Sequence, residues 1–147
     1  MFDRFADDVR HTVLYAVEQS RLLGHDQVGT EHLLLALVRD DDSDTGQLLR
    51  AAGADSAAVH PLIQPSRDQP RETLGRIPFT PRAKQALEQA LRVAEGLHQP
   101  RIRQPHLLGG LLRVRDSTAV RLLVDLGVDL DALADEADAL ATETEPT

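Results

Sequence analysis

The sequence contains no cysteine and no tryptophan, and aromatic residues make up only 3% of its 147 positions. Without cysteine, disulfides and thiolate metal sites are excluded. Leucine, valine and alanine must therefore supply most of the core, since apolar residues still make up 41% of the chain. No apolar run approaches the ~20 residues of a membrane-spanning helix, and the first residues show no secretory signal pattern. We expect a soluble, cytoplasmic protein.

The motifs of the common enzyme classes are also missing. The phosphate-binding loop G-x-x-x-x-G-K-[ST] is excluded because no such glycine precedes the single lysine of the chain. Neither H-E-x-x-H nor G-x-S-x-G occurs. Asp40, Asp42 and Asp44 resemble the first ligands of a calcium loop, but Thr45 and Ala51 replace the glycine and glutamate that such a loop requires. The sequence predicts no enzyme, with no catalytic residue, no cofactor and no metal site.

Charge is unevenly distributed along a chain whose net charge is −8. Residues 1–66 have a net charge of −6, residues 67–115 of +6, and residues 116–147 of −8. A basic segment can attract an anionic partner, although such blocks more often only solvate a linker or a helix face. The few aromatic residues and the negative total argue against a nucleic-acid binder.

What the chain has instead is a sequence repeat at a constant offset of 74 residues, without a gap. Such an offset indicates a tandem duplication of one structural unit. Two related units present two related surfaces and one junction between the units. This arrangement favours a binding module over an enzyme with a single catalytic cleft. The identical residues at this offset include Phe5/Phe79, Ala16/Ala90, Leu23/Leu97, His32/His106, Leu33/Leu107, Leu34/Leu108, Leu37/Leu111, Arg39/Arg113, Leu48/Leu122, Leu49/Leu123, Gly53/Gly127 and Asp55/Asp129.

Helical periodicity runs through both copies, and no segment alternates in the way that strands do. We predict an all-α fold of eight helices, arranged as two tandem four-helix units with pseudo-twofold symmetry. In the first copy one helix covers about 3–23, the second is capped by Thr30, the third carries Leu48 and Leu49, and the fourth starts near Asp55. In the second copy the helices are expected near 81–98, 105–114, 117–126 and 129–141.

These units are predicted to form a single domain over 1–141. The first repeat covers about 1–64 and the second about 79–141. Between them, 65–78 contains three prolines and a glycine and is predicted to be an extended linker. The last residues, 142–147, are predicted to be a frayed tail.

His32 and His106 hold equivalent positions, each directly before two leucines in the first turn of its helix. No neighbouring ligand completes a metal site, so we expect both to serve one packing or hydrogen-bonding role. The histidines without an equivalent in the other copy are predicted to be exposed; they are His11, His25, His60 and His98.

Three segments resemble the Clp N-terminal repeat. Residues 29–37, GTEHLLLAL, resemble its GTEH signature, and residues 77–84, IPFTPRAK, resemble the opening of the second repeat in the ClpC group. Residues 1–5, MFDRF, resemble the start of actinobacterial ClpC unfoldases. The resemblance covers about residues 1–141. In that family the domain precedes two ATPase modules, docks adaptors and substrates, and delivers them to a ClpP protease.

The resemblance implies a non-catalytic module that binds peptides, adaptor proteins or cyclic peptide antibiotics, with no nucleic-acid or membrane partner. A stand-alone actinobacterial protein of this kind would act as an adaptor, or as a decoy that captures a toxin aimed at the ClpC unfoldase and lowers free toxin by mass action. Alternatively, the chain is the detached regulatory domain of a full ClpC ATPase, which would dock substrates in cis, including arginine-phosphorylated ones.

Two sets of site residues follow from the resemblance. In Gram-positive relatives a glutamate in each signature helps to bind phosphorylated arginine. Glu31 matches the first, but Pro105 stands at the second and cannot pair with a guanidinium, so at most one such site is expected. Alternatively, Glu31 only complements the helix dipole.

The second set matches the surface on which actinobacterial relatives bind cyclic peptide antibiotics, on the first helices of both repeats. Apolar groups there would be buried by the ligand, and charged groups would orient its polar backbone. Alternatively, Val13 and Leu87 belong to the core. The matching ligand-binding positions are Phe2, Arg10, Val13, Leu14, Phe79, Lys84, Leu87 and Glu88.

Overall fold

The computed structural model describes residues 2–40, 42–66 and 78–143, which form eight α-helices and two short 3₁₀ helices. The first repeat contains η1 (Phe2–Arg4), α1 (Asp7–Leu22), α2 (Thr30–Arg39), α3 (Asp44–Ala51), α4 (Ser56–Val59) and η2 (His60–Leu62). The second contains α5 (Pro81–Gly96), α6 (Gln104–Arg113), α7 (Thr118–Asp125) and α8 (Leu130–Glu143). The predicted all-α fold of two four-helix units is confirmed.

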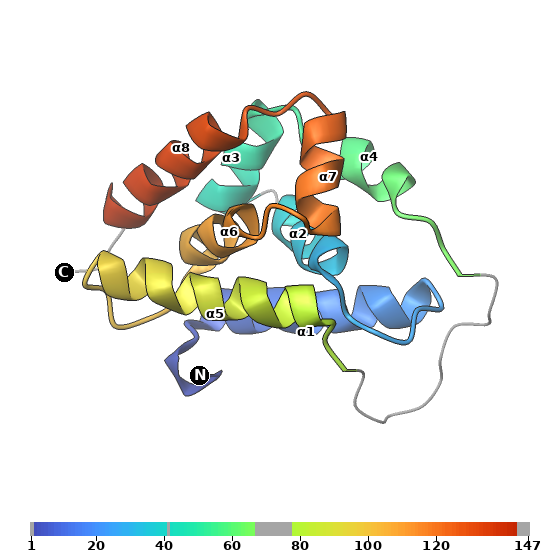
Figure 1. Cartoon of the computed structure of the whole chain (residues 1–147), viewed down its shortest axis with the longest axis horizontal. Coiled ribbons are helices and arrows are strands. Elements are labelled where there is room, and N and C mark those ends of the chain that lie inside the picture. Colours follow the sequence, from blue (N-terminus) through green and yellow to red (C-terminus); the bar gives the residue numbers. More distant parts are fainter. Residues whose placement is uncertain (1, 41, 67–77, 144–147) are drawn as a thin grey trace.

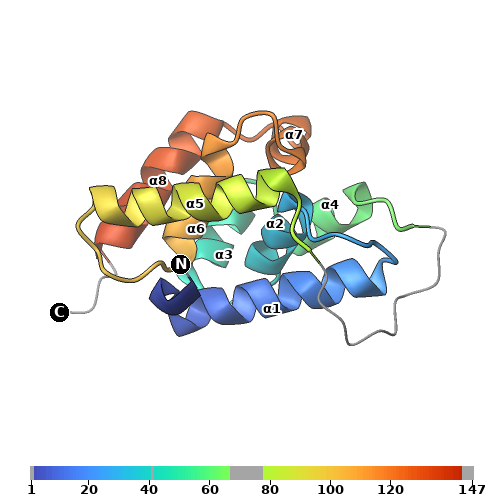
Figure 2. The same cartoon turned by 60° about the horizontal axis from the view of Figure 1, so that its bottom comes forward.

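The two central helices, α2 and α6, are apolar on almost every side and are covered by the others. The long helices α1 and α5 lie on one side of them, and α3, α4, α7 and α8 lie on the other (Figures 1 and 2). A helix that is apolar all round must be buried in this way. The leucines that fill the centre have no exposed surface; they are Leu33, Leu34, Leu37, Leu107, Leu108 and Leu111.

The opening segment of each repeat pairs through its backbone with a residue of the other repeat, and this reciprocal pairing reflects the pseudo-twofold relation. Phe5 pairs with Ile102 in an isolated bridge, and Val28 pairs with Phe79 in the equivalent bridge. Backbone hydrogen bonds of 2.8 to 2.9 Å flank both bridges. The exchange links the two repeats into one unit with a shared core.

The caps of the shorter helices repeat as well. Ser43 accepts a hydrogen bond from the N–H of Gly46 at the start of α3, and Ser117 accepts one from Val120 at the start of α7. Asp55 caps α4 through Ala58 in the same way that Asp129 bonds Ala132 at the start of α8. A polar side chain that accepts an otherwise unpaired N–H stabilises a helix start by about 1 kcal/mol.

The cap predicted at Thr30 is wrong. The N-cap of α2 is Gly29, and Thr30 is the first helical residue. Its buried hydroxyl instead accepts a hydrogen bond of 3.0 Å from the N–H of Ala119 at the start of α7. The ring of His32 bonds the N–H of Gly29 at 2.9 Å. Thr30 therefore serves the contact between the repeats.

The remaining boundaries agree with expectation to within a few residues. Helix α8 continues to Glu143, two residues beyond its predicted end. Most of the predicted linker, 67–77, and the end of the predicted tail, 144–147, lie outside the described residues. Within the part of the chain that the structure does describe, no helix has the length and apolar character needed to cross a membrane.

Candidate functional site

A pocket of about 460 Å³ opens beside the first two turns of α1, and three of the eight predicted ligand-binding residues line it. We call it the apolar pocket; it is lined by Asp3, Phe5, Arg10, Val13 and Leu14. Phe5 is buried, Val13 is half-buried against the core, and Leu14 is 66% exposed. An exposed leucine beside a pocket of this size suits an apolar ligand. Phe2 begins η1, but its side chain lies outside the described residues.

The second-repeat members of the predicted surface do not line this pocket. Lys84 and Glu88 are exposed on α5, and they hold the positions equivalent to Arg10 and Leu14. Leu87 is only 3% exposed and belongs to the core, as in the alternative interpretation, so its inward position removes it from the surface that a ligand meets.

Phe79 is half-buried, with its ring packed against the core. Its backbone pairs with Val28, and the following residue, Thr80, caps α5 by accepting the N–H of Ala83. The ring therefore lies at the junction between the repeats.

A second pocket, of about 270 Å³, surrounds the start of α2. We call it the Glu31 pocket; its lining is Gly24, His25, Asp26, Gln27, Gly29, Glu31, His32, Ser66 and Thr80. The Glu31 carboxylate lies against Gly29, because a Cβ at that position would clash with Oε1 of Glu31 and lie 2.8 Å from its Cδ. Glu31 thus stands beside the positive end of α2, where a carboxylate is favourable.

Two histidines form one wall of the Glu31 pocket. Nδ1 of His25 lies 2.8 Å from Nε2 of His32, and Nε2 of His25 lies 2.8 Å from the carbonyl oxygen of Gln64. His25 is therefore half-buried and hydrogen-bonded, and the prediction that it is exposed is wrong. His11, His60 and His98 are exposed as expected.

The structural role expected of His32 and His106 is confirmed. Nδ1 of His106 accepts the N–H of Arg103 at 2.9 Å, as Nδ1 of His32 accepts that of Gly29. Burial lowers the pKa of His32 to about 4, and the neighbouring His25 acts in the same direction. Burial also lowers the pKa of His106 to about 4, with Arg103 acting in the same direction. Both rings are neutral at neutral pH.

The second repeat has different chemistry at the place equivalent to the Glu31 pocket. Pro105 replaces Glu31, and Arg103 replaces Gly29. Side-chain nitrogens of Gln99 and Arg103 both donate to the carbonyl oxygen of Ala141, near the end of α8. This place thus carries a basic residue and is hydrogen-bonded to the last turn of α8.

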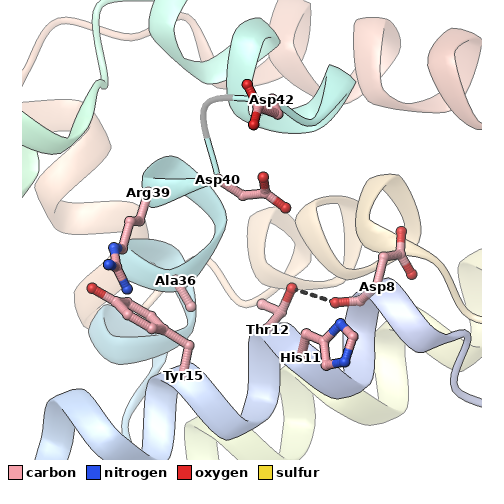
Figure 3. Close-up of a pocket in the computed structure, with 8 residues that line it drawn as sticks. All are labelled: Asp8, His11, Thr12, Tyr15, Ala36, Arg39, Asp40 and Asp42. Carbon is pink, nitrogen blue, oxygen red and sulfur yellow. Dashed lines mark hydrogen bonds between the residues drawn. The ribbon is translucent and has the colours of Figure 1, made fainter.

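A third and larger cavity, of about 660 Å³, separates the start of α1 from the end of α2. We call it the acidic cavity; it is lined by Asp8, His11, Thr12, Tyr15, Ala36, Arg39, Asp40 and Asp42. Figure 3 shows the α1 side chains facing Arg39 and Asp40 across the opening. The Arg39 guanidinium lies 4.2 Å from the centre of the Tyr15 ring, a cation–π contact.

Hydrogen bonds donated by Gln104 join the walls of the acidic cavity to the second repeat. The Gln104 side chain donates to Thr12 at 3.1 Å and to Asp40 at 3.2 Å, and its backbone N–H donates to Asp8 at 3.2 Å. Burial raises the pKa of Asp8 above its usual range, and the Asp40 carboxylate acts in the same direction. No group of three ligating side chains suited to a metal occurs among the described residues.

The acidic cavity lies where the first repeat has larger residues than the second. Helices α5 and α6 cross so closely that a Cβ at Gly110 would clash with the carbonyl oxygen of Ala86 and lie 2.6 Å from the nitrogen of Ala90. The equivalent residue in the first repeat is Ala36, which lines the cavity. Thr12 is the equivalent of Ala86, so both positions carry a larger residue in the first repeat, and both line the cavity.

Comparisons by sequence and by structure lead to the same protein family. The Clp repeat (R) N-terminal domain matches residues 4–77 and again residues 78–146. The chain is 34% identical over 131 residues to a Bacillus subtilis (strain 168) protein named negative regulator of genetic competence ClpC/MecB, which covers 89% of this chain and 16% of that protein. It is 36% identical over 137 residues to chaperone protein ClpC1, chloroplastic, of Arabidopsis thaliana, covering 88% and 14%. The chain spans only a small part of these relatives.

Solved structures share the fold. The N-terminal domain of the caseinolytic protease associated chaperone ClpD from Arabidopsis thaliana has a TM-score of 0.77 at 25% identity, covering 97% of both chains. A ClpV N-domain in complex with a VipB peptide has a TM-score of 0.72 at 20% identity, covering 99% of this chain and 91% of that one. The two matched repeats, the eight-helix fold and the ClpC relatives show that this chain belongs to the Clp repeat (R) N-terminal domain family.

Proposed function

We propose that the chain is a non-catalytic binding module of the Clp protease system and that it takes apolar peptides, above all cyclic ones, at the apolar pocket. Its family and its ClpC relatives support a role in docking substrates or adaptors. The solved complex of a ClpV N-domain with a VipB peptide is an example of peptide binding by this fold.

The observation that carries the proposal is the exposure of Leu14. A leucine that is 66% exposed gives up much of the hydrophobic stabilisation it would gain on burial. It stands at the rim of a 460 Å³ pocket whose floor is the buried Phe5, with Asp3 and Arg10 beside it. Apolar side chains of a ligand would enter the pocket, and the two charged groups would meet its polar backbone.

The proposal is tested by calorimetric titration with a cyclomarin-type cyclic peptide. Leu14→Glu places at this position the residue that the second repeat has at Glu88, and it should weaken binding at least about tenfold, or ~1.4 kcal/mol. Phe2→Ala should weaken binding by a similar factor, because large aromatic anchors carry much of the energy of such contacts.

Leu22→Glu is the matched control, because Leu22 is a second leucine of α1, 49% exposed and outside the apolar pocket. It should leave the affinity unchanged. Equal binding by the wild type and Leu14→Glu, or no binding by the wild type, would rule out the apolar pocket as the site.

For the Glu31 pocket we propose a single, weak site for phosphorylated arginine. Glu31 contributes to the lining of this pocket a carboxylate, the group that pairs with a guanidinium, whereas the equivalent place in the second repeat offers Pro105 and a basic residue. Titration should give one site that Glu31→Ala removes. Two equivalent sites, or binding unaffected by this substitution, would contradict the proposal.

Two biological settings fit a module of this kind. As a separate chain it would act as an adaptor, or as a decoy that captures cyclic peptide antibiotics aimed at the ClpC unfoldase. As part of a ClpC ATPase it would dock substrates in cis. Adding the module to a ClpC–ClpP degradation assay inhibited by the peptide tests capture itself in either setting, because captured peptide no longer inhibits the unfoldase.

A further inference from the structure

The opening segment of the first repeat supplies part of the apolar pocket but is held by the second repeat. Asp3, in η1, and Phe5, directly after it, both line the pocket. The segment lies against the loop between α5 and α6, residues 97–103 (Figure 2). A loop of the second repeat therefore helps to set the place of these two lining residues.

Two backbone hydrogen bonds join this segment to the loop. The N–H of Ile102 donates to the carbonyl oxygen of Arg4, and the N–H of Ala6 donates to that of Ile102, both at 2.9 Å. The equivalent pair of bonds, at 2.8 and 2.9 Å, joins Val28 to the residues on either side of Phe79. The backbone pairing thus belongs to the duplicated fold and occurs at both openings.

Two arginine side chains add further contacts between η1 and the second repeat. Nε of Arg4 donates to the carbonyl oxygen of Pro100 at 3.2 Å, and Nη1 of Arg4 lies 3.7 Å from Oε2 of Glu95 on α5. From the loop, Nη1 of Arg101 donates to the carbonyl oxygen of Asp3 at 3.4 Å. These contacts hold η1 from both sides of the junction.

The arginine contacts are not repeated with the same residues at the other opening. Pro78 stands at the position equivalent to Arg4 and has no side-chain donor. Arg21 stands at the position equivalent to Glu95, so the acidic partner is missing as well. The two openings share their backbone pairing, and the additional side-chain contacts of Arg4 lie at the opening that carries the apolar pocket.

We propose that Arg4 and Arg101 are positioning residues for the apolar pocket, which hold η1 in the place from which Asp3 and Phe5 line it. Neither arginine lines the pocket itself. The inference rests on the proposed function of this pocket. A wall that is already in place does not have to be ordered when a ligand binds. When η1 is loosened, only a fraction of the molecules is ready to bind, and the apparent affinity falls by that fraction.

The first part of the test uses the whole chain without peptide. In Arg4→Ala and in Arg101→Ala, amide hydrogen exchange of Ala6 and Ile102 should become about fivefold faster. Exchange of Val28, in the equivalent bridge, should stay unchanged. The urea midpoint should also stay that of the wild type, because Arg101 is exposed and Arg4 is partly exposed.

The second part is calorimetric titration of the same proteins with a cyclomarin-type peptide. Each of the two variants should bind about fivefold more weakly than the wild type. Arg115→Ala is the matched control, because it removes an exposed arginine that also forms an ion pair, with Asp131 at 2.9 Å, but lies outside the lining of the pocket. It should change neither the exchange of Ala6 nor the affinity.

Four results would overturn the inference: unchanged exchange of Ala6 and Ile102, faster exchange with unchanged affinity, a lower urea midpoint that accounts for both changes, or equal weakening by Arg115→Ala. Binding that Leu14→Glu weakens and neither arginine variant does would overturn this inference and leave the proposed function standing. No binding by the wild type would overturn both. The two arginine variants test the same claim independently, so the failure of one of them to fold leaves the other to decide it.

Discussion

Two adjacent glycines of α6, Gly109 and Gly110, should respond in opposite ways to the same substitution. In Gly110→Ala the new methyl group meets backbone atoms of α5, clashing with the Ala86 carbonyl oxygen and lying 2.6 Å from the nitrogen and 2.9 Å from the Cα of Ala90. Backbone atoms in a packed helix cannot rotate away, so the two helices must separate.

The expected change in the free energy of unfolding of Gly110→Ala is the sum of two opposing contributions. Overpacking of a well-packed contact costs about 1–3 kcal/mol, and a backbone clash belongs at the upper end of that range. Alanine gains about 1 kcal/mol over glycine in a helix interior. The free energy of unfolding of Gly110→Ala should therefore fall by about 1–2 kcal/mol. For a chain of this size the melting temperature falls by ~2–4 °C per kcal/mol.

Gly109→Ala is the control one residue away. Its methyl group would lie 3.5 Å from a Val93 side-chain carbon, an ordinary van der Waals contact, and it gains the same helix propensity. This variant should be as stable as the wild type or more stable by up to about 1 kcal/mol. The assay is urea unfolding followed by circular dichroism. A Gly110→Ala variant at least as stable as Gly109→Ala would refute the close crossing of α5 and α6.

Three further predictions rest on other contacts. Gly29→Ala should move the Glu31 carboxylate from its place and weaken phosphoarginine binding as Glu31→Ala does, with circular dichroism unchanged. His106→Ala should lower the free energy of unfolding by about 2 kcal/mol, because it removes the acceptor of the Arg103 N–H and one of the two donors to the Gln99 amide oxygen, which keeps only the Arg103 guanidinium at 3.3 Å; a loss below about 1 kcal/mol would contradict the structural role. In the folded protein the pKa of His32 and of His106 is lowered to about 4, so the unfolded chain takes up these protons first as the pH falls. The free energy of unfolding should therefore be at its full value above about pH 6.5 and should decrease as the pH is lowered toward 4, by up to about 3 kcal/mol per ring. In urea titrations, His32→Gln should reduce this dependence on pH, and His60→Gln, at an exposed position, should not.

Much of the fold could be read from the repeat and the helical periodicity. Both depend on local spacing, and the equivalent positions also revealed the shared role of His32 and His106. Thr30 was misassigned because threonine is a good N-cap in isolation, whereas the neighbouring His32 ring already bonds the N–H of Gly29, leaving Thr30 to contact α7.

The interactions missed from sequence are those that join segments distant along the chain. The bond from His25 to Gln64 spans 39 residues, and no periodicity marks it. The one available signal was that the equivalent of His25 is Gln99, a residue able to make the same bonds with a neutral amide.

The acidic cavity also marks a difference between the repeats that a helical pattern tolerates. Ala36 and Gly110 both suit a buried helix, and only the structure shows that Gly110 lies against backbone atoms of α5 whereas Ala36 lines a cavity. For the predicted ligand surface, the family resemblance grouped Arg10, Val13 and Leu14, which all line the apolar pocket, but it left open whether Leu87 faces the core, which only the structure shows.

The most direct test of the central claim is ¹⁵N-resolved NMR titration of the wild-type chain with a cyclomarin-type peptide. If the chain is a peptide-binding module that uses the apolar pocket, saturable shifts should concentrate on residues 3–14 and should need at least about tenfold more peptide in Leu14→Glu. No saturable shifts, or shifts centred on the Glu31 pocket or the acidic cavity and retained in Leu14→Glu, would contradict it.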